Sequence, residues 1–326
     1  MSILVVGGAG YIGSHAARAL RRCGYEVIIY DNLSRGHAFL ADGFELIAAD
    51  IADHAKLSRA MNRVDAVMHF AAHSQVGESV QNPRIYFQNN AELGLALLNC
   101  ALDAGICRLV FSSTCAVYGV PQKVPITEDT PRQPVNPYGT SKLFFENALE
   151  AYDRAYGFRY MSLRYFNAAG ADESGEIGEL HDPETHLIPA ALKAISGERG
   201  ELELFGSDYP TPDGTCIRDY VHVNDLAEAH VLALKELEAG KSSAALNLGT
   251  GVGRSVNEVI GMVEEVTGSK VPRRVAPRRA GDPPVLVADP SRAHSALGWS
   301  AKRSLREIVQ TAWQWETKGV QPMRRK

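Results

Sequence analysis

The sequence is poor in cysteine and in long apolar runs, and both absences limit where the protein can work. Its five cysteines are scattered, odd in number and without a C-x-x-C pair, a pattern typical of reduced thiols. No apolar run approaches the roughly 18 residues of a membrane-spanning helix, and no basic stretch precedes the first apolar segment as in a secretory signal. We therefore expect a cytoplasmic protein without a membrane partner.

The sequence also has few clusters of basic residues. The 34 Lys and Arg residues are outnumbered by 38 Asp and Glu residues, and they gather only in short runs at 273–279 and 323–326. A nucleic-acid-binding protein is expected to carry a broad basic surface, so the sequence argues against such a partner. The histidines show no metal-ligand spacing, and we predict no bound metal.

What the sequence does contain is a regular alternation of short apolar runs and helical segments. Apolar runs of this length are typical of buried parallel strands, and the segments between them, such as 90–104, have helical spacing. This alternation predicts a Rossmann-type doubly wound parallel α/β sheet, whose ligands bind at the carboxyl ends of the strands. We place the strands at 2–6, 26–30, 44–48, 66–70 and 109–111.

A glycine-rich turn follows the first of these strands directly. Gly7, Gly10 and Gly13 are three residues apart, and a helical pattern continues from them through Leu20. Glycines at this place allow a tight turn and a close approach of the backbone to a ligand, and a helix N-terminus favours a pyrophosphate. The strand before the turn and the helix after it separate this motif from an ordinary loop, so it predicts a dinucleotide site.

Carboxylates at the ends of the next two strands refine that prediction. Asp31 ends the second strand, about 20 residues beyond the glycines, where a carboxylate accepts hydrogen bonds from the adenosine ribose and repels a 2′-phosphate. This selects NAD over NADP. Asp50 and Ile51 end the third strand and are placed to hold the adenine; alternatively, Asp50 begins the following loop or helix.

Tyr138 and Lys142 form the candidate catalytic pair. Four residues apart on a helix, they share one face, and the strand-end hydroxyl of Thr114 completes the set. A cation about 4 Å from the phenol is worth roughly 4 kcal/mol at an effective dielectric near 20, enough to lower the phenol pKa by about three units. Such a set can move protons beside a bound nicotinamide. A Tyr and a Lys at this spacing are also common on solvated helix faces.

The longer motifs resemble those of the extended short-chain dehydrogenase/reductase family, and within it the enzymes that epimerise nucleotide sugars at C4. The resemblance spans nearly the whole chain. It implies interconversion of UDP-glucose and UDP-galactose by reversible hydride transfer between sugar C4 and tightly bound NAD, through a 4-keto sugar. The motifs are GGAGYIG (7–13), SSTCAVYG (112–119), YGTSK (138–142), LRYFN (163–167), FGSDYPT (205–211), RDYVHV (218–223), NLGTG (247–251) and RAGD (279–282).

The resemblance also implies roles for individual residues. Tyr138 takes the proton of the sugar 4-OH, Thr114 orients that hydroxyl, and Lys142 holds the nicotinamide ribose. The residues implied to bind NAD are Gly7, Gly10, Tyr11, Ile12, Gly13, Asp31, Asn32, Asp50, Ile51, Phe70, Ala71, Ala72, Asn89, Ser112, Tyr138, Lys142 and Phe166. Those implied to bind the UDP-sugar are Thr114, Tyr138, Asn167, Leu187, Leu204, Phe205 (uracil), Arg218 and Arg279 (diphosphate) and Asp282 (ribose).

The residues after Thr114 separate related enzymes. Nucleotide-sugar dehydratases of this family need an acid and a base there, typically Asp-Glu, and decarboxylating relatives want a nearby Glu. Cys115 and Ala116 cannot do that work, which favours simple epimerisation.

Three positions depart from the pattern of these relatives. Ser74 stands where a Lys is frequent, which removes one cationic contact to the cofactor that the resemblance would otherwise imply. His186 stands where an Asn is frequent. Leu286 occupies the position that gates sugar size and is intermediate between a bulky Tyr and a small residue. A UDP-pentose (xylose or arabinose) or UDP-N-acetylhexosamine 4-epimerase is therefore an alternative, and a catalytically idle NAD sensor is a third hypothesis.

A change in composition after Asn167 marks the predicted domain boundary. We expect an NAD-binding domain at 1–168 and a smaller α/β UDP-sugar-binding domain at 169–326. Segments near 218–250, expected to be a helix and then a strand, can rejoin the first domain. The resemblance also implies a homodimer formed by the helices around 90–104 and 138–156.

Overall fold

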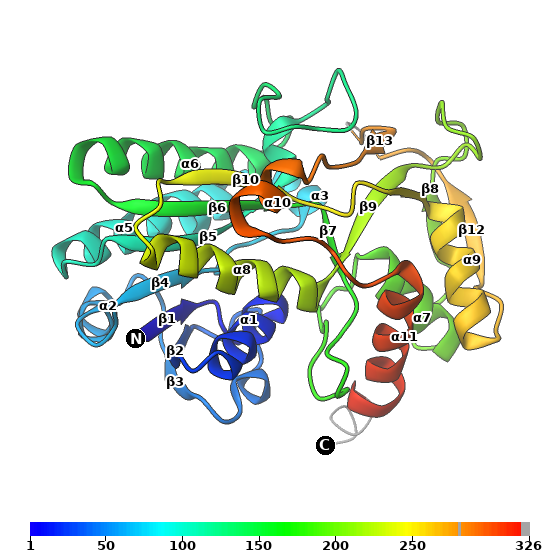
Figure 1. Ribbon diagram of the computed structural model, residues 1–326. Helices are drawn as coiled ribbons and strands as arrows, with labels where there is room; N and C mark the ends of the chain where they lie inside the picture. The colour runs from blue at the N-terminus through cyan, green and yellow to red at the C-terminus, as the bar shows by residue number, and fades with distance from the viewer. Residues whose placement is uncertain (280–281, 321–326) are drawn as a thin grey trace.

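Seven parallel strands form the main sheet, in the order β10-β6-β5-β4-β1-β2-β3 (Figure 1). The structure is a computed structural model that describes residues 1–279 and 282–320. Successive strands run outward from β1 in both directions, so the strand order reverses between β1 and β4, where α/β sheets open a ligand crevice. The strands are β1 (Ser2–Val6), β2 (Glu26–Asp31), β3 (Glu45–Ala48), β4 (Ala66–His69), β5 (Arg108–Thr114), β6 (Arg159–Tyr165) and β10 (Ala244–Leu248).

Helices cover both faces of this sheet. Alternate residues of β1 enter two different cores: Ile3 and Val5 face one layer of helices, and Leu4 and Val6 face the other. Because both faces are buried, the strands read as continuous apolar runs rather than as an alternation. The first layer contains α1 (Tyr11–Arg22), α8 (Val223–Glu238) and α10 (Ser291–Leu297). The second contains α2 (His54–Met61), α5 (Leu93–Asp103) and α6 (Pro137–Tyr156).

A smaller α/β region lies beside the carboxyl end of the main sheet, on the right in Figure 1. Its central strand is β9 (Ile217–His222), which pairs with β7 (Asn167–Ala169), β11 (Gly253–Ser255) and β13 (Val285–Leu286). A separate parallel pair joins β8 (Leu202–Phe205) to β12 (Arg273–Ala276). Its own hydrophobic core is covered by α7 (Leu187–Ser196), α9 (Val256–Thr267) and α11 (Leu305–Gln314).

The helix predicted at 90–104 is confirmed: a π-helical turn, Phe87–Glu92, leads directly into α5. One predicted element differs from the structure. The helix expected from residue 218 begins only at Val223, because residues 217–222 are strand β9, buried and paired on both sides. Pairing of residues 217–222 with strands on both sides thus sets the start of the helix at Val223.

The predicted return of the chain to the first domain has a structural counterpart: α8 packs on α1, and β10 pairs with β6 at the edge of the main sheet. The division at residue 168 itself stays a prediction. Among the described residues, no helix combines the length and the apolar character needed to cross a membrane. The remaining short elements are α3 (Val76–Gln81), α4 (Pro83–Tyr86), the 3₁₀ turns Ala38–Ala41 and Cys115–Tyr118, and the π turn Trp315–Val320.

Candidate active site

A cavity of about 1110 Å³ lies along the carboxyl ends of the main sheet and extends to the smaller region. Its wall contains every residue predicted to bind NAD, from the glycine turn to Phe166. Of the residues predicted to bind the UDP-sugar, it contains Thr114, Tyr138, Asn167, Arg218, Arg279 and Asp282. The fold therefore brings the predicted NAD residues and six of the nine predicted UDP-sugar residues together in one space.

Three predicted sugar-nucleotide residues lie outside this wall. Leu204 is buried in the core of the smaller region, because alternate residues of β8 point inward, and Leu187 packs against the same core. The Phe205 ring is covered by the guanidinium of Arg279, 4.0 Å from its centroid. The role predicted for these three residues stays a prediction.

The turn between β1 and α1 has the close backbone packing that the glycines suggest. Gly7 has φ +82°, and a Cβ there would lie 2.4 Å from the Ala71 amide nitrogen. A Cβ on Gly13 would lie 2.2 Å from the Gly7 carbonyl oxygen. Helix α1 has no acidic residue in its first turn, so the partial positive charge of its N-terminus is not neutralised there. The turn fits a dinucleotide pyrophosphate.

Asp31 presents a fixed carboxylate at the end of β2. It accepts hydrogen bonds from the backbone amides of Ala9 (3.0 Å) and Leu33 (2.8 Å). Burial raises its pKa, and these two hydrogen bonds oppose that rise. The two amides thus occupy two of the lone-pair positions of the Asp31 carboxylate and orient it. Its remaining lone pairs can accept hydrogen bonds from ribose hydroxyls. Asn32 donates to Asp50 (2.7 Å) at the same end of the cavity.

Tyr138 stands in the first turn of α6, whose start is defined by its sequence. Pro137 occupies the first helical position, and the Asn136 side chain caps the helix by accepting from the Gly139 amide (2.8 Å). Burial raises the pKa of the Tyr138 phenol to about 12, while a hydrogen bond with Thr114 acts in the opposite direction. The phenol and the strand-end hydroxyl both line the cavity.

Lys142 is held against the main sheet, and its predicted effect on the phenol stays a prediction. Its ammonium donates to the Ser112 carbonyl (2.8 Å) and lies 4.8 Å from the centre of the Phe111 ring, on the main sheet. Burial lowers the Lys142 pKa to about 7, opposed by Glu146. The prediction assumed a full charge beside Tyr138, but the fold buries the ammonium against strand β5, where it is easily deprotonated.

Lys142 gives the stability of nucleotide-free protein a characteristic pH dependence. Its native pKa of about 7 lies below the ordinary value of 10.5, so between these values the unfolded chain holds a proton that the native state lacks. The free energy of unfolding then rises with pH across this window, by up to about 1.4 kcal/mol per pH unit. Urea denaturation from pH 7 to 9.5 should show this rise in the wild type and in the exposed-site control Lys241→Met, but not in Lys142→Met. Parallel pH profiles for all three would contradict it.

Two supporting networks were not evident from the sequence. Asn90 donates to Ser141 Oγ (3.0 Å), which in turn donates to the Tyr138 carbonyl (2.8 Å), and so fixes the start of α6. Beneath Lys142, Glu146 forms a buried ion pair with Arg164, with Nη2 and Oε2 2.6 Å apart. Both networks join residues that are distant in the chain, so no local motif marks them.

The residues 179–186, which we call the crossing segment, form a further part of the wall, and of these the sequence analysis had singled out His186 alone. Three residues of the larger region donate to or contact its backbone: Arg35 at Asp182 O (3.2 Å), His37 at Leu180 O (3.0 Å) and Gln75 at Pro183 O (3.2 Å). Glu179, His181 and His186 of this segment line the cavity. Ser74 and Leu286, two of the departing positions, line it as well.

The buried Arg218 already has an internal partner, since its guanidinium forms an ion pair with Asp282. The two residues predicted to contact diphosphate and ribose are thus held together at the end of the cavity formed by the smaller region. An ion pair of this kind orients the planar guanidinium and leaves its other donors for an anion.

Comparison with known proteins agrees with this arrangement. A curated relative, the UDP-glucose 4-epimerase of Rhizobium leguminosarum bv. trifolii, is 48% identical over 322 residues, covering 98% of each chain. The crystal structure of UDP-glucose 4-epimerase from Brucella ovis in complex with NAD has a TM-score of 0.93 at 49% identity, covering 96% of this chain and 97% of that one. The UDP-glucose-4-epimerase from Stenotrophomonas maltophila with bound NAD and formylated UDP-arabinopyranose has a TM-score of 0.95 at 42% identity, covering 100% and 99%.

The family model described as the NAD dependent epimerase/dehydratase family matches residues 3–249, which include the glycine turn, Asp31 and the catalytic pair. With a match over most of its length and relatives of this similarity, the chain belongs to the NAD-dependent epimerase/dehydratase family.

Proposed function

We propose that this protein interconverts UDP-glucose and UDP-galactose, with NAD as its cofactor. The observation that carries the proposal is the meeting of Tyr138 and Thr114 with the glycine turn and Asp31 in one cavity. Relatives that are 46–50% identical over nearly the whole chain carry the hexose name, which favours this substrate over the pentose and N-acetylhexosamine alternatives. Residues 1–168, with α8 and β10, would hold NAD, and the remainder would hold the UDP-sugar.

In the proposed mechanism, Tyr138 takes the proton of the sugar 4-OH while Thr114 orients that hydroxyl. The glycine turn and Asp31 would hold NAD⁺, which would supply the acceptor for the C4 hydride. After the 4-keto sugar turns over in the site, the hydride would return to the opposite face of C4, and Tyr138 would return the proton to O4. Arg218 and Arg279 hold the diphosphate while the sugar moves.

Cys115 and Ala116 support epimerisation without elimination of water. Both line the cavity beside Thr114, where a dehydratase needs an acid and a base. Burial raises the pKa of the Cys115 thiol, and Ala116 has no titratable group. Neither position therefore offers the carboxylic acid or the carboxylate base that elimination of water needs.

The experiment that tests the proposal is conversion of UDP-galactose to UDP-glucose by purified protein without added NAD. Conversion is expected because the cofactor is carried by the protein. The medium-sized side chain of Leu286 does not by itself select among these sugars. A panel with UDP-xylose and UDP-N-acetylglucosamine therefore tests the substrate range. Faster conversion of either would replace the hexose assignment, and bound NAD without any conversion would favour the sensor hypothesis.

The position of Asp31 predicts cofactor selectivity. A buried carboxylate fixed by two amides repels a 2′-phosphate, so NADP should bind at least about tenfold more weakly than NAD, a difference of about 1.4 kcal/mol. Competition of the two nucleotides for cofactor-depleted protein measures this ratio. Asp31→Asn keeps the acceptor oxygen and removes the charge, so it should bring the affinity for NADP closer to that for NAD. Equal affinities in the wild type would refute the argument.

We also propose that the protein is a homodimer that pairs through α5 and α6. Phe144 and Phe87 are 44% and 42% exposed, and together with Leu95 they line a shallow apolar depression. Phe144→Glu should therefore shift the protein to monomer in size-exclusion chromatography with light scattering, with unchanged circular dichroism. Val275→Glu, at an apolar and 65% exposed position on β12, is the control and should leave the mass unchanged. Monomeric wild type would end the proposal.

The proposed location is the cytoplasm. All five cysteines are free thiols, and two of them, Cys23 and Cys107, are exposed. Exposed thiols persist in a reducing compartment.

A further inference from the structure

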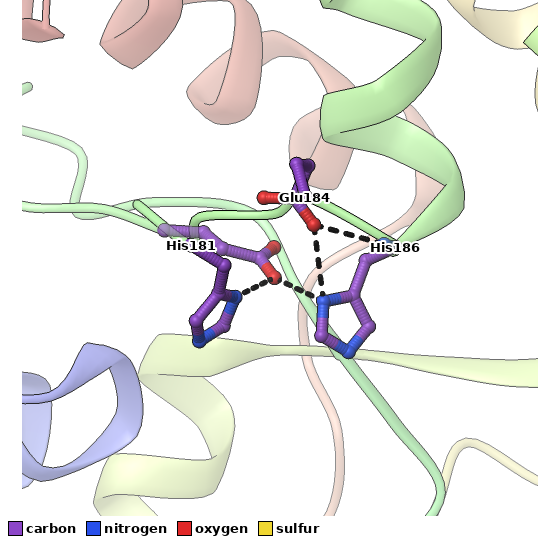
Figure 2. Close-up of side chains that lie close together, drawn as sticks. His181, Glu184 and His186 are labelled. Carbon is purple, nitrogen blue, oxygen red and sulfur yellow. Dashed lines mark hydrogen bonds and ion pairs between the residues drawn. The ribbon is translucent and has the colours of Figure 1, made fainter. Parts of the chain in front are cut away.

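Four side chains with metal-ligating atoms meet in the crossing segment, just before α7 (Figure 2). One carboxylate oxygen of Glu179 lies 2.9 Å from Nδ1 of His181 and 2.6 Å from Nδ1 of His186. Oε1 of Glu184 lies 3.3 Å from the same His186 nitrogen. The four potential ligand atoms all lie within 4.8 Å of one another.

Burial makes this cluster unusual. The side chains of Glu179 and Glu184 are only 5% and 3% exposed, and two buried carboxylates side by side are costly without positive charge between them. One oxygen of Glu184, Oε2, has no hydrogen-bond partner. Two buried carboxylates beside two imidazole nitrogens thus form a site whose negative charge a bound cation would neutralise.

The backbone holds these ligands in place independently of their mutual contacts. Trp315 Nε1 donates to the Glu179 carbonyl (2.8 Å), and Arg199 donates to the Glu184 carbonyl (2.9 Å). Oε1 of Glu184 also accepts the amides of Thr185 and His186, both at 2.8 Å. A preorganised set of this kind loses little conformational freedom when it binds an ion.

We propose that Glu179, His181, Glu184 and His186 bind one divalent transition-metal ion, with Zn²⁺ the best fit. Tetrahedral ligands about 2.0–2.1 Å from zinc lie roughly 3.3 Å from one another. The four atoms, now all within 4.8 Å of one another, would adjust to that spacing on binding. Two imidazole nitrogens with two carboxylate oxygens suit zinc better than magnesium or calcium. A bidentate Glu184 would also satisfy its unpartnered oxygen.

The ion would tie the crossing segment to the start of α7. Because Arg35, His37 and Gln75 hold the same segment from the other side, the metal would stiffen one wall of the cavity. This is a structural role, and it is separate from the proton transfer assigned to Tyr138. The spacing E-x-H-x-x-E-x-H at 179–186 is the signal in the sequence that the prediction of no metal overlooked.

The test is a Zn²⁺ titration of the full-length protein after chelator treatment and dialysis, followed by competition with a chromophoric indicator. One ion per chain is expected, with affinity falling from pH 8 to pH 6 as protons compete for the imidazoles. His181→Ala and Glu184→Gln should each weaken binding at least about tenfold. His54→Ala, an exposed histidine on α2, should leave it unchanged.

Circular dichroism of both variants checks that the fold is kept, and Glu184→Gln retains the oxygen that accepts the two amides. X-ray absorption at the zinc edge should show nitrogen and oxygen ligands without sulfur. Equal affinity in the wild type and both variants, or sulfur ligands from the free cysteines, would overturn the proposal. Absence of stoichiometric binding in the wild type would overturn it as well.

Discussion

Tyr138→Phe is expected to lower the turnover of UDP-galactose by at least about 10²-fold, the usual contribution of a general acid–base group. The substitution removes one oxygen from a residue whose backbone is fixed by the Asn136 cap and by the Ser141 hydroxyl. The aromatic ring remains to fill the same part of the cavity wall. The loss should therefore appear in turnover, while the NAD content of the purified protein stays near that of the wild type.

The matched control is Tyr156→Phe, which removes the same hydroxyl from an exposed position at the other end of α6. It should leave turnover unchanged. An almost unchanged rate in Tyr138→Phe would remove this residue from the proton-transfer role. A proportional loss of bound NAD would instead assign it to cofactor binding.

Gly7→Ala is expected to lower turnover per chain by about 10²-fold and to reduce the NAD content. The new Cβ would lie 2.4 Å from the Ala71 nitrogen and 2.7 Å from its Cα, both backbone atoms that cannot rotate away. Relief needs a backbone shift of about 1 Å between the ends of β1 and β4, and a misplacement of that size can cost about 10²-fold in rate. The left-handed φ adds roughly 1 kcal/mol of strain.

Gly24→Ala is the control that separates the steric clash of the new Cβ from the strain of a left-handed backbone. Gly24 has a nearly identical φ of +85°, but a Cβ there meets no atom within 4 Å. It should lose stability by roughly the cost of the left-handed φ and keep its NAD and its turnover. If both variants behave alike, close packing at the glycine turn is not what holds the cofactor.

The fold and the cofactor side of the cavity were predictable because they depend on local patterns. Apolar runs and glycine spacing define β1, the turn and α1, and a parallel sheet then brings strand-end residues such as Asp31 and Thr114 to one edge. The sugar-nucleotide side was less predictable. Whether Leu204 faces a core or a cavity depends on how β8 pairs with β12, which no short motif encodes.

The pKa values of the candidate catalytic pair, Tyr138 and Lys142, could not be predicted from their spacing in the sequence. Spacing on a helix suggested that the Lys142 charge acts on Tyr138, but burial dominates both groups and moves their pKa values in opposite directions. The partners of Lys142, the Ser112 carbonyl and Glu146, come from the strand below and the next helical turn. Desolvation of this kind depends on the complete tertiary structure.

The central claim is that hydride leaves sugar C4 and returns to the same carbon of the same molecule, with Tyr138 carrying only the hydroxyl proton. The most direct measurement uses UDP-galactose deuterated at C4, incubated in ordinary water without added NAD, and mass analysis with NMR of the UDP-glucose formed. The account predicts that the product keeps deuterium at C4. Replacement of that deuterium by solvent hydrogen would mean that C4 loses a proton rather than a hydride, and would contradict the account.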